Sequence, residues 1–183
     1  LFFLIISCNT PEQKSTFIPA FDSKTAFSYL ELQCDFGPRN PGSNGHINFS
    51  NYLNNFLKQL NGELIVQDFL YIEPITDSQR AGKNFIIQFN SDANYRLLLG
   101  AHWDTRSFSD QDDNADNFNS PVLGANDGAS GTAVLMEIAN IISDNNPNIG
   151  IDIVFFDAED GGIAGKPETF ALGAKYFAEN LPI

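Results

Sequence analysis

The sequence predicts an α/β domain with a mixed, mostly parallel sheet and helices on both faces. Two short apolar runs, residues 96–101 and 151–156, have the length and composition of buried strands. Between them, residues 128–143 repeat apolar side chains at helical spacing. A strand, a helix and a second strand in this order indicate a right-handed crossover between parallel strands. Ligands of such sheets bind beyond the carboxyl ends of the strands, so a site is expected there.

Two amphipathic helices are predicted upstream, over residues 21–36 and 45–60. Cys34 lies in the apolar-periodic part of the first helix, where a buried, inert thiol is expected. His46 lies at the start of the second helix. Because helix starts are commonly polar, His46 is expected to be exposed.

Strands are predicted over residues 63–73, 83–90 and 95–101, with a hairpin turn at residues 91–94 between the last two. The first half of the chain therefore enters the sheet through antiparallel strands. A final helix is predicted over residues 169–180. The acidic loop over residues 107–120 lacks the Gly and Glu of an EF-hand, so we expect a solvated loop that borders the site.

Composition limits the possible functions. The 183 residues suffice for one domain with a sizeable core. A net charge of -13 argues against nucleic acid as a partner, because a phosphate backbone requires a basic patch.

Residues 1–8, LFFLIISC, predict the end of a secretory signal that stops at Cys8. The segment resembles a bacterial lipoprotein cleavage site, which implies a lipid anchor on Cys8 and a location in the cell envelope. The alternative is a terminal strand or helix that ends in an ordinary cysteine. The apolar run is too short to span a membrane, so membrane contact is expected only through the lipid. Residues 9–20 would be a polar tether, and residues 21–183 the catalytic domain.

Five polar residues are expected to lie on one edge of the sheet. His102 and Asp104 come just after the first strand of the crossover, and Glu159 and Asp160 just after the second. Asp127 lies at the start of the crossover helix, which faces the same edge. The sequence therefore gathers one imidazole and four carboxylates on one rim.

Carboxylates packed this closely repel one another, and a divalent cation removes that cost. Mixed imidazole and carboxylate ligands suit zinc. Of two adjacent acids at a strand end, one can bind metal while its neighbour is a general base. Two alternatives stay open: Asp127 as a helix cap, and Glu159 and Asp160 as surface acids favoured by a helix dipole. Asp157 lies closer to the strand body and is expected to be structural or to support the metal ligands without binding the metal.

Four segments carry a family resemblance: FGPRNPGS at residues 36–43, HWD at 102–104, GANDGASG at 124–131 and FFDAED at 155–160. In this order and spacing they resemble the zinc aminopeptidases and the glutaminyl cyclases that share their fold. The match spans roughly residue 21 to the end of the chain. GAHWDT, GANDGASG and DAED are most similar to the bacterial glutaminyl cyclases.

This resemblance implies a zinc-dependent glutaminyl-peptide cyclotransferase that acts on the amino termini of peptides or proteins. Asp127 and Asp160 would bind a single zinc, and Glu159 would carry a proton. Asp160 stands where many relatives have Glu. The family completes its zinc site with a later histidine, and this chain has only His46 and His102. We therefore expect the chain to be the amino-terminal part of a longer protein.

Two other functions remain possible. In two-zinc aminopeptidases the residue that corresponds to His102 binds the second metal, and the one that corresponds to Asp104 orients it. That alternative predicts two zinc ions, hydrolysis of the first peptide bond and Glu159 again as the base. The third possibility is a non-catalytic surface lipoprotein that binds peptide ends.

Overall fold

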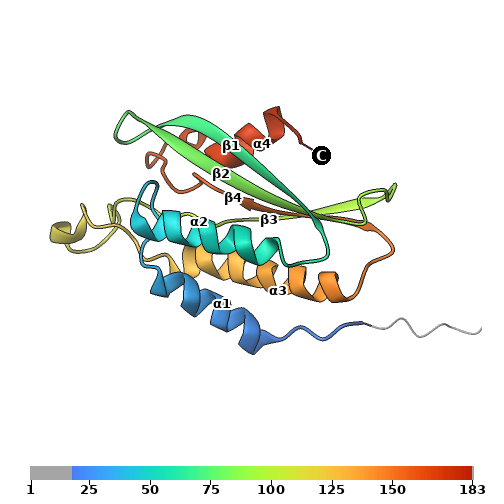
Figure 1. The fold of residues 1–183 in the computed structure, drawn as a ribbon. Helices are drawn as coiled ribbons and strands as arrows, with labels where there is room; N and C mark the ends of the chain where they lie inside the picture. The colour runs from blue at the N-terminus through green and yellow to red at the C-terminus, as the bar shows by residue number, and fades with distance from the viewer. Residues whose placement is uncertain (1–17, 183) are drawn as a thin grey trace, which may run out of the picture.

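The computed structural model describes residues 18–182, which form one sheet with helices on both faces (Figure 1). The sheet has the order β1-β2-β4-β3, in which β1 is Glu63–Glu73, β2 is Ser78–Phe89, β4 is Gly150–Phe156 and β3 is Arg96–His102. The helices are α1 (Ser23–Asp35), α2 (Asn44–Leu57), α3 (Gly131–Asp144) and α4 (Leu172–Glu179). The predicted α/β class, the mixed sheet and the helices on both faces are confirmed.

The predicted crossover is present, because β3 and β4 pair in parallel and α3 connects them. The hairpin predicted at residues 91–94 is wrong. β4 lies between β2 and β3, and it pairs antiparallel with β2. The physical reason is that the first six residues of β4 are buried, so the backbone N–H and C=O groups on both edges of this strand need hydrogen-bond partners. Two of the three pairings are thus antiparallel, and the described part of the sheet is less parallel than the sequence predicts.

One face of the sheet carries α2 and α3, with α1 outside against α3, and α4 covers the other face (Figure 1). The main core lies between α2, α3 and the sheet. It includes the buried side chains Phe49, Leu53, Phe85, Met136 and Ile153. In α2, Phe49, Leu53 and Leu57 recur every four residues, which places all three on the inward face. A smaller cluster of Ile86, Val154 and Phe177 fixes α4 on the opposite face.

Two helices begin later than their periodicity predicts. Residues 125–130 form an irregular turn in which Asp127 has a non-helical backbone, so the regular helix α3 begins at Gly131. Pro167–Thr169 form a short 3-10 turn, and Ala171 has a φ of 56°, so α4 begins at Leu172. In both cases a stretch of non-helical backbone at the predicted start delays the regular helix.

Two expectations about single side chains also change. His46 is predicted to be exposed but is buried, with 7% of its surface accessible. Its ring stacks on Trp103, and its Nε2 forms a hydrogen bond with Asp157. Cys34 is partly buried and forms no disulfide among residues 18–182. The prediction for Cys8 lies outside the described residues. Within residues 18–182, no helix has the length and apolar character needed to cross a bilayer.

Candidate metal centre

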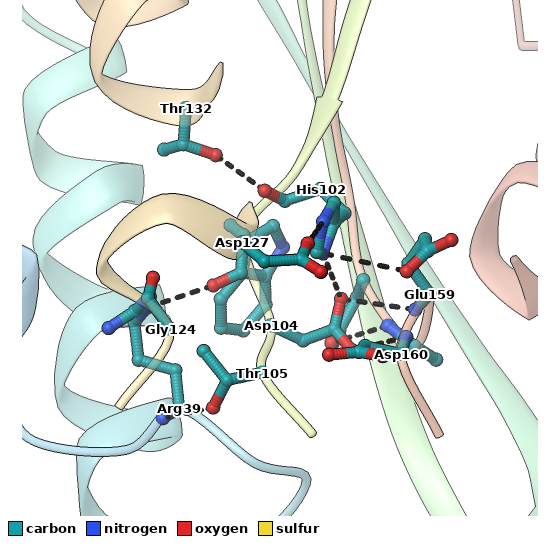
Figure 2. A network of polar contacts seen from close by, with 12 residues as sticks. Arg39, His102, Asp104, Thr105, Gly124, Asp127, Thr132, Glu159 and Asp160 are labelled. Atoms are coloured by element: carbon teal, nitrogen blue, oxygen red, sulfur yellow. Dashed lines mark hydrogen bonds and ion pairs between the residues drawn. The ribbon is translucent and has the colours of Figure 1, made fainter. Parts of the chain in front are cut away.

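The structure brings the five predicted rim residues together where β3 and β4 end (Figure 2). His102 is the last residue of β3, and Asp104 follows two positions later. Glu159 and Asp160 come just after β4, which ends at Phe156. The backbone N–H of Trp103 donates to the carbonyl of Phe156 at 2.9 Å, so the two segments stay paired just past the strands.

Asp127 reaches the rim through a contact with His102. Its Oδ1 lies 2.8 Å from His102 Nε2. Its carboxylate caps neither the turn at residues 125–130 nor α3, so the helix-cap alternative is wrong. Gly128 permits this close approach, since a Cβ there would lie 2.4 Å from the carbonyl oxygen of His102.

Asp104 is fully buried and ties the two strand ends together. Its Oδ1 accepts from the backbone N–H of Glu159 at 3.0 Å, and its Oδ2 accepts from that of Asp160 at 3.2 Å. Its distance to His102 Nδ1 is longer, 3.5 Å, and that nitrogen is buried without a hydrogen-bond partner among the described residues. Asp104 therefore holds the backbone of the two acids more directly than it holds the imidazole.

Crowding of like charges changes the acid–base behaviour of the rim. Burial raises the pKa of Asp160 to about 7, and repulsion by Asp127, Asp104 and Glu159 adds to it. Burial also raises the pKa of Glu159, with Asp104 and Asp127 acting in the same direction. Burial alone would lower the pKa of His102, but Asp104, Glu159 and Asp127 outweigh it and raise that pKa to about 9.

Sequence reasoning missed Arg106, which lies on the same rim. Its guanidinium forms a two-point ion pair with Asp110, at 2.7 and 2.6 Å. It also donates to the carbonyls of Asp160 and Gly162, both at 3.0 Å, and so supports the loop after β4. The available signal was a single cation two residues after Asp104, followed by an acid at i+4.

Arg39 was also missed, although it lies inside the FGPRNPGS segment. It is fully buried and donates to the carbonyls of Trp103, Gln33 and Gly124, each at 3.0 Å. Through these bonds it connects the segment after β3 with the turn that carries Asp127 (Figure 2). A buried cation bound to backbone carbonyls leaves no pattern in the sequence, since its partners are not side chains.

A pocket of about 320 Å³ opens at the rim. It is lined by Arg106, Gln111, Val122, Asp127, Asp160, Ala164 and Phe170. Gln111 comes from the loop over residues 107–120, so the expectation that this loop borders the site is confirmed. Asp127, which precedes α3, and Asp160, which follows β4, thus line the same pocket.

The chemistry of this donor set fits a divalent cation. The Asp127 charge raises the pKa of Asp160, so a cation between the two carboxylates would relieve their repulsion, and zinc accepts carboxylate oxygens as ligands. Within residues 18–182, however, no three His, Cys, Asp or Glu side chains are arranged to enclose a metal ion. Asp127 and Asp160 would supply two ligands, and the later histidine that the resemblance implies is not in this chain.

Comparison with known proteins places this site in a family. Residues 84–182 match the model of peptidase family M28. A curated relative, the glutaminyl-peptide cyclotransferase of Bos taurus, is 24% identical over 153 residues, which cover 78% of this chain and 41% of that protein.

Solved structures agree with this placement. The glutaminyl cyclase of Bacteroides thetaiotaomicron is 36% identical, with a TM-score of 0.87, over 91% of this chain and 59% of that one. A leucine aminopeptidase precursor from the same species is also 36% identical, with a TM-score of 0.87, over 92% and 60%. The chain therefore spans less than two thirds of these relatives, and it belongs to peptidase family M28.

Proposed function

We propose that this protein is a zinc-dependent glutaminyl-peptide cyclotransferase, which converts amino-terminal glutamine into pyroglutamate and releases ammonia. The observation that carries the proposal is the convergence of Asp127 and Asp160 on one pocket, with Glu159 beside them on the same rim. The bovine relative and the Bacteroides cyclase, which are named for this reaction, support the choice of cyclisation.

Asp127 and Asp160 would hold the metal, from the turn before α3 and from the loop after β4. Bound zinc would supply Lewis-acid polarisation of the side-chain amide carbonyl of the substrate glutamine. Asp104 fixes the backbone at Glu159 and Asp160, and therefore sets where both carboxylates stand. Arg106 donates a hydrogen bond to the carbonyl of Asp160.

Glu159 would move the proton. Its carboxylate accepts a proton from the attacking α-amine, whose nitrogen forms a bond to the side-chain carbonyl carbon. The same proton then passes to the amide nitrogen as its bond to that carbon breaks, and ammonia leaves. Burial raises the pKa of Glu159, which makes its carboxylate a stronger base than an exposed one.

An aminopeptidase is the second candidate, and a specific observation favours it. His102 contacts Asp127 at 2.8 Å, so a second metal ligand could stand directly beside the first. The leucine aminopeptidase precursor is also as similar to this chain as the cyclase is. With two metals, Glu159 would activate water, and the product would be a free amino acid.

Zinc titration separates the two candidates. The full-length gene product is stripped with a chelator, zinc is added back, and ammonia release from a glutamine-initiated peptide is followed. We expect full activity at one zinc per chain. Activity that requires a second zinc and appears only as release of the first residue would contradict the cyclase and favour the aminopeptidase. Magnesium, added as a control at the same concentration, should restore nothing, because it prefers octahedral oxygen sites.

The lipid anchor on Cys8 and the envelope location remain predictions from the sequence. They would bring the enzyme to extracytoplasmic peptides without a membrane-spanning helix.

A further inference from the structure

His46 is not one of the residues that line the pocket at the rim. It comes from the first turn of α2 and is 7% exposed. Its Nε2 lies 3.0 Å from Asp157 Oδ1 and 3.1 Å from Oδ2. Its ring stacks on the indole of Trp103, with centroids 4.4 Å apart and planes 25° from parallel. Neither contact belongs to the proposed chemistry, but Asp157 lies two residues before Glu159, and Trp103 directly precedes Asp104.

Asp157 controls the turn that leads to the two acids. Its Oδ1 accepts from the backbone N–H of Ala158 at 2.8 Å, and its Oδ2 accepts from that of Lys83 at 2.8 Å. Ala158 has a φ of 55°, a left-handed conformation that alanine rarely adopts. Such a conformation persists only where its surroundings fix it, so the turn before Glu159 depends on the Asp157 carboxylate.

Trp103 directly follows β3, just as Asp157 directly follows β4. It separates His102 from Asp104, and in extended backbone its side chain points opposite to theirs. Its indole N–H donates to the carbonyl of Lys83 at 3.1 Å. Lys83 therefore donates to Asp157 through its backbone N–H and accepts from Trp103 through its carbonyl. These two bonds link the segments that follow β3 and β4.

His46 contacts both Asp157 and Trp103, and it is a hydrogen-bond partner of the buried Asp157 carboxylate. The Asp157 carboxylate is almost completely buried, and burial raises its pKa while His46 opposes that rise. For His46, burial lowers the pKa, but the charge and hydrogen bond of Asp157 outweigh it, so the pKa is raised. Removal of the imidazole would leave the buried Asp157 carboxylate without the side-chain partner that lies 3.0 Å from it, a costly arrangement that the turn can relieve by moving.

We propose that His46 is a positioning residue of the metal centre, which holds Asp157 and Trp103 so that Glu159 and Asp160 stand correctly against Asp104. The inference rests on the proposed function, because it assigns His46 to the same zinc site. It adds a residue that contacts neither substrate nor metal.

Three variants of the full-length gene product test this role. His46→Leu fills a similar volume but cannot donate to Asp157. His46→Gln keeps an N–H donor at the same place. Leu57→Ala, a fully buried position about three helical turns along α2, is the matched control for lost packing. For each, zinc affinity is measured by chelator competition, and kcat is measured per zinc-bound molecule well below its Tm.

We expect His46→Leu to lower both zinc affinity and kcat by about 10-fold or more, as for other residues that orient metal ligands. His46→Gln should restore most of both. Leu57→Ala should lower Tm and leave both unchanged, because it acts on packing alone. Wild-type zinc affinity and kcat in a folded His46→Leu protein would overturn the proposal and make His46 an ordinary core residue.

Two further outcomes are informative. If neither His46 variant folds, Asp157→Asn removes the same ion pair from the other side, and unchanged zinc affinity in that variant overturns the proposal. If the wild-type protein binds zinc but does not cyclise glutamine, the proposed function fails, while zinc affinity still tests His46. A wild-type protein that binds no zinc overturns both.

Discussion

Replacing Glu159 with Gln is expected to lower kcat for cyclisation by about 100- to 10,000-fold, the usual contribution of a positioned proton carrier. The amide has nearly the same shape but cannot accept the α-amine proton. The backbone N–H of residue 159 still donates to Asp104, so the loop after β4 should keep its place. Zinc should remain bound, because Glu159 is not one of the proposed ligands. The measurement is ammonia release from a glutamine-initiated peptide, with zinc content determined on the same sample.

Glu179→Gln is the matched control for this change. Glu179 is exposed at the end of α4, so the same loss of charge should leave kcat unchanged. Near-wild-type turnover in Glu159→Gln would remove Glu159 as the proton carrier. Loss of zinc together with activity would instead make Glu159 part of the metal site.

Replacing Asp127 with Ala is expected to lower zinc affinity by at least about 100-fold, more than the loss of a residue that only orients a ligand. Asp127 supplies one of the two carboxylates that line the pocket, and Asp160 supplies the other. Its removal leaves Asp160 alone there, while His102 loses its 2.8 Å partner. Chelator competition and metal content measure the effect.

Asp116→Ala controls for the change in net charge. Asp116 is exposed in the loop over residues 107–120 and is not one of the residues that line the pocket. This variant should bind zinc as the wild type does. If Asp127→Ala retains its zinc, then Asp127 is only the hydrogen-bond partner of His102, and the proposed ligand set is wrong.

The crossover and the rim could be predicted because their signals are local. The apolar run at residues 151–156 and the helical spacing before it each specify one element. The rule that ligands lie beyond strand carboxyl ends then brought Asp127 and Asp160 together without any distance information. Both regular helices next to the site begin later than predicted, because an apolar pattern does not record where the backbone leaves helical φ and ψ values.

The contacts that support the site could not be predicted, because each joins residues far apart in the chain. His46 and Asp157 are 111 positions apart, and Arg39 and Gly124 are 85 apart. A polar residue in a first helical turn is usually exposed, and His46 is buried because the fold places Trp103 and Asp157 against its ring. The order β2-β4-β3 could not be predicted either. Strands that are adjacent in sequence suggested a hairpin at residues 91–94, but β4 lies between them.

The central claim is tested most directly by offering the full-length gene product two peptides that differ only in the first residue, glutamine or leucine, and identifying the products by mass spectrometry. The account predicts that the glutamine peptide loses ammonia and keeps its full length, while the leucine peptide is unchanged. Release of free leucine, with the glutamine peptide uncyclised, would contradict it. His102 would then become the expected ligand of a second zinc in an aminopeptidase.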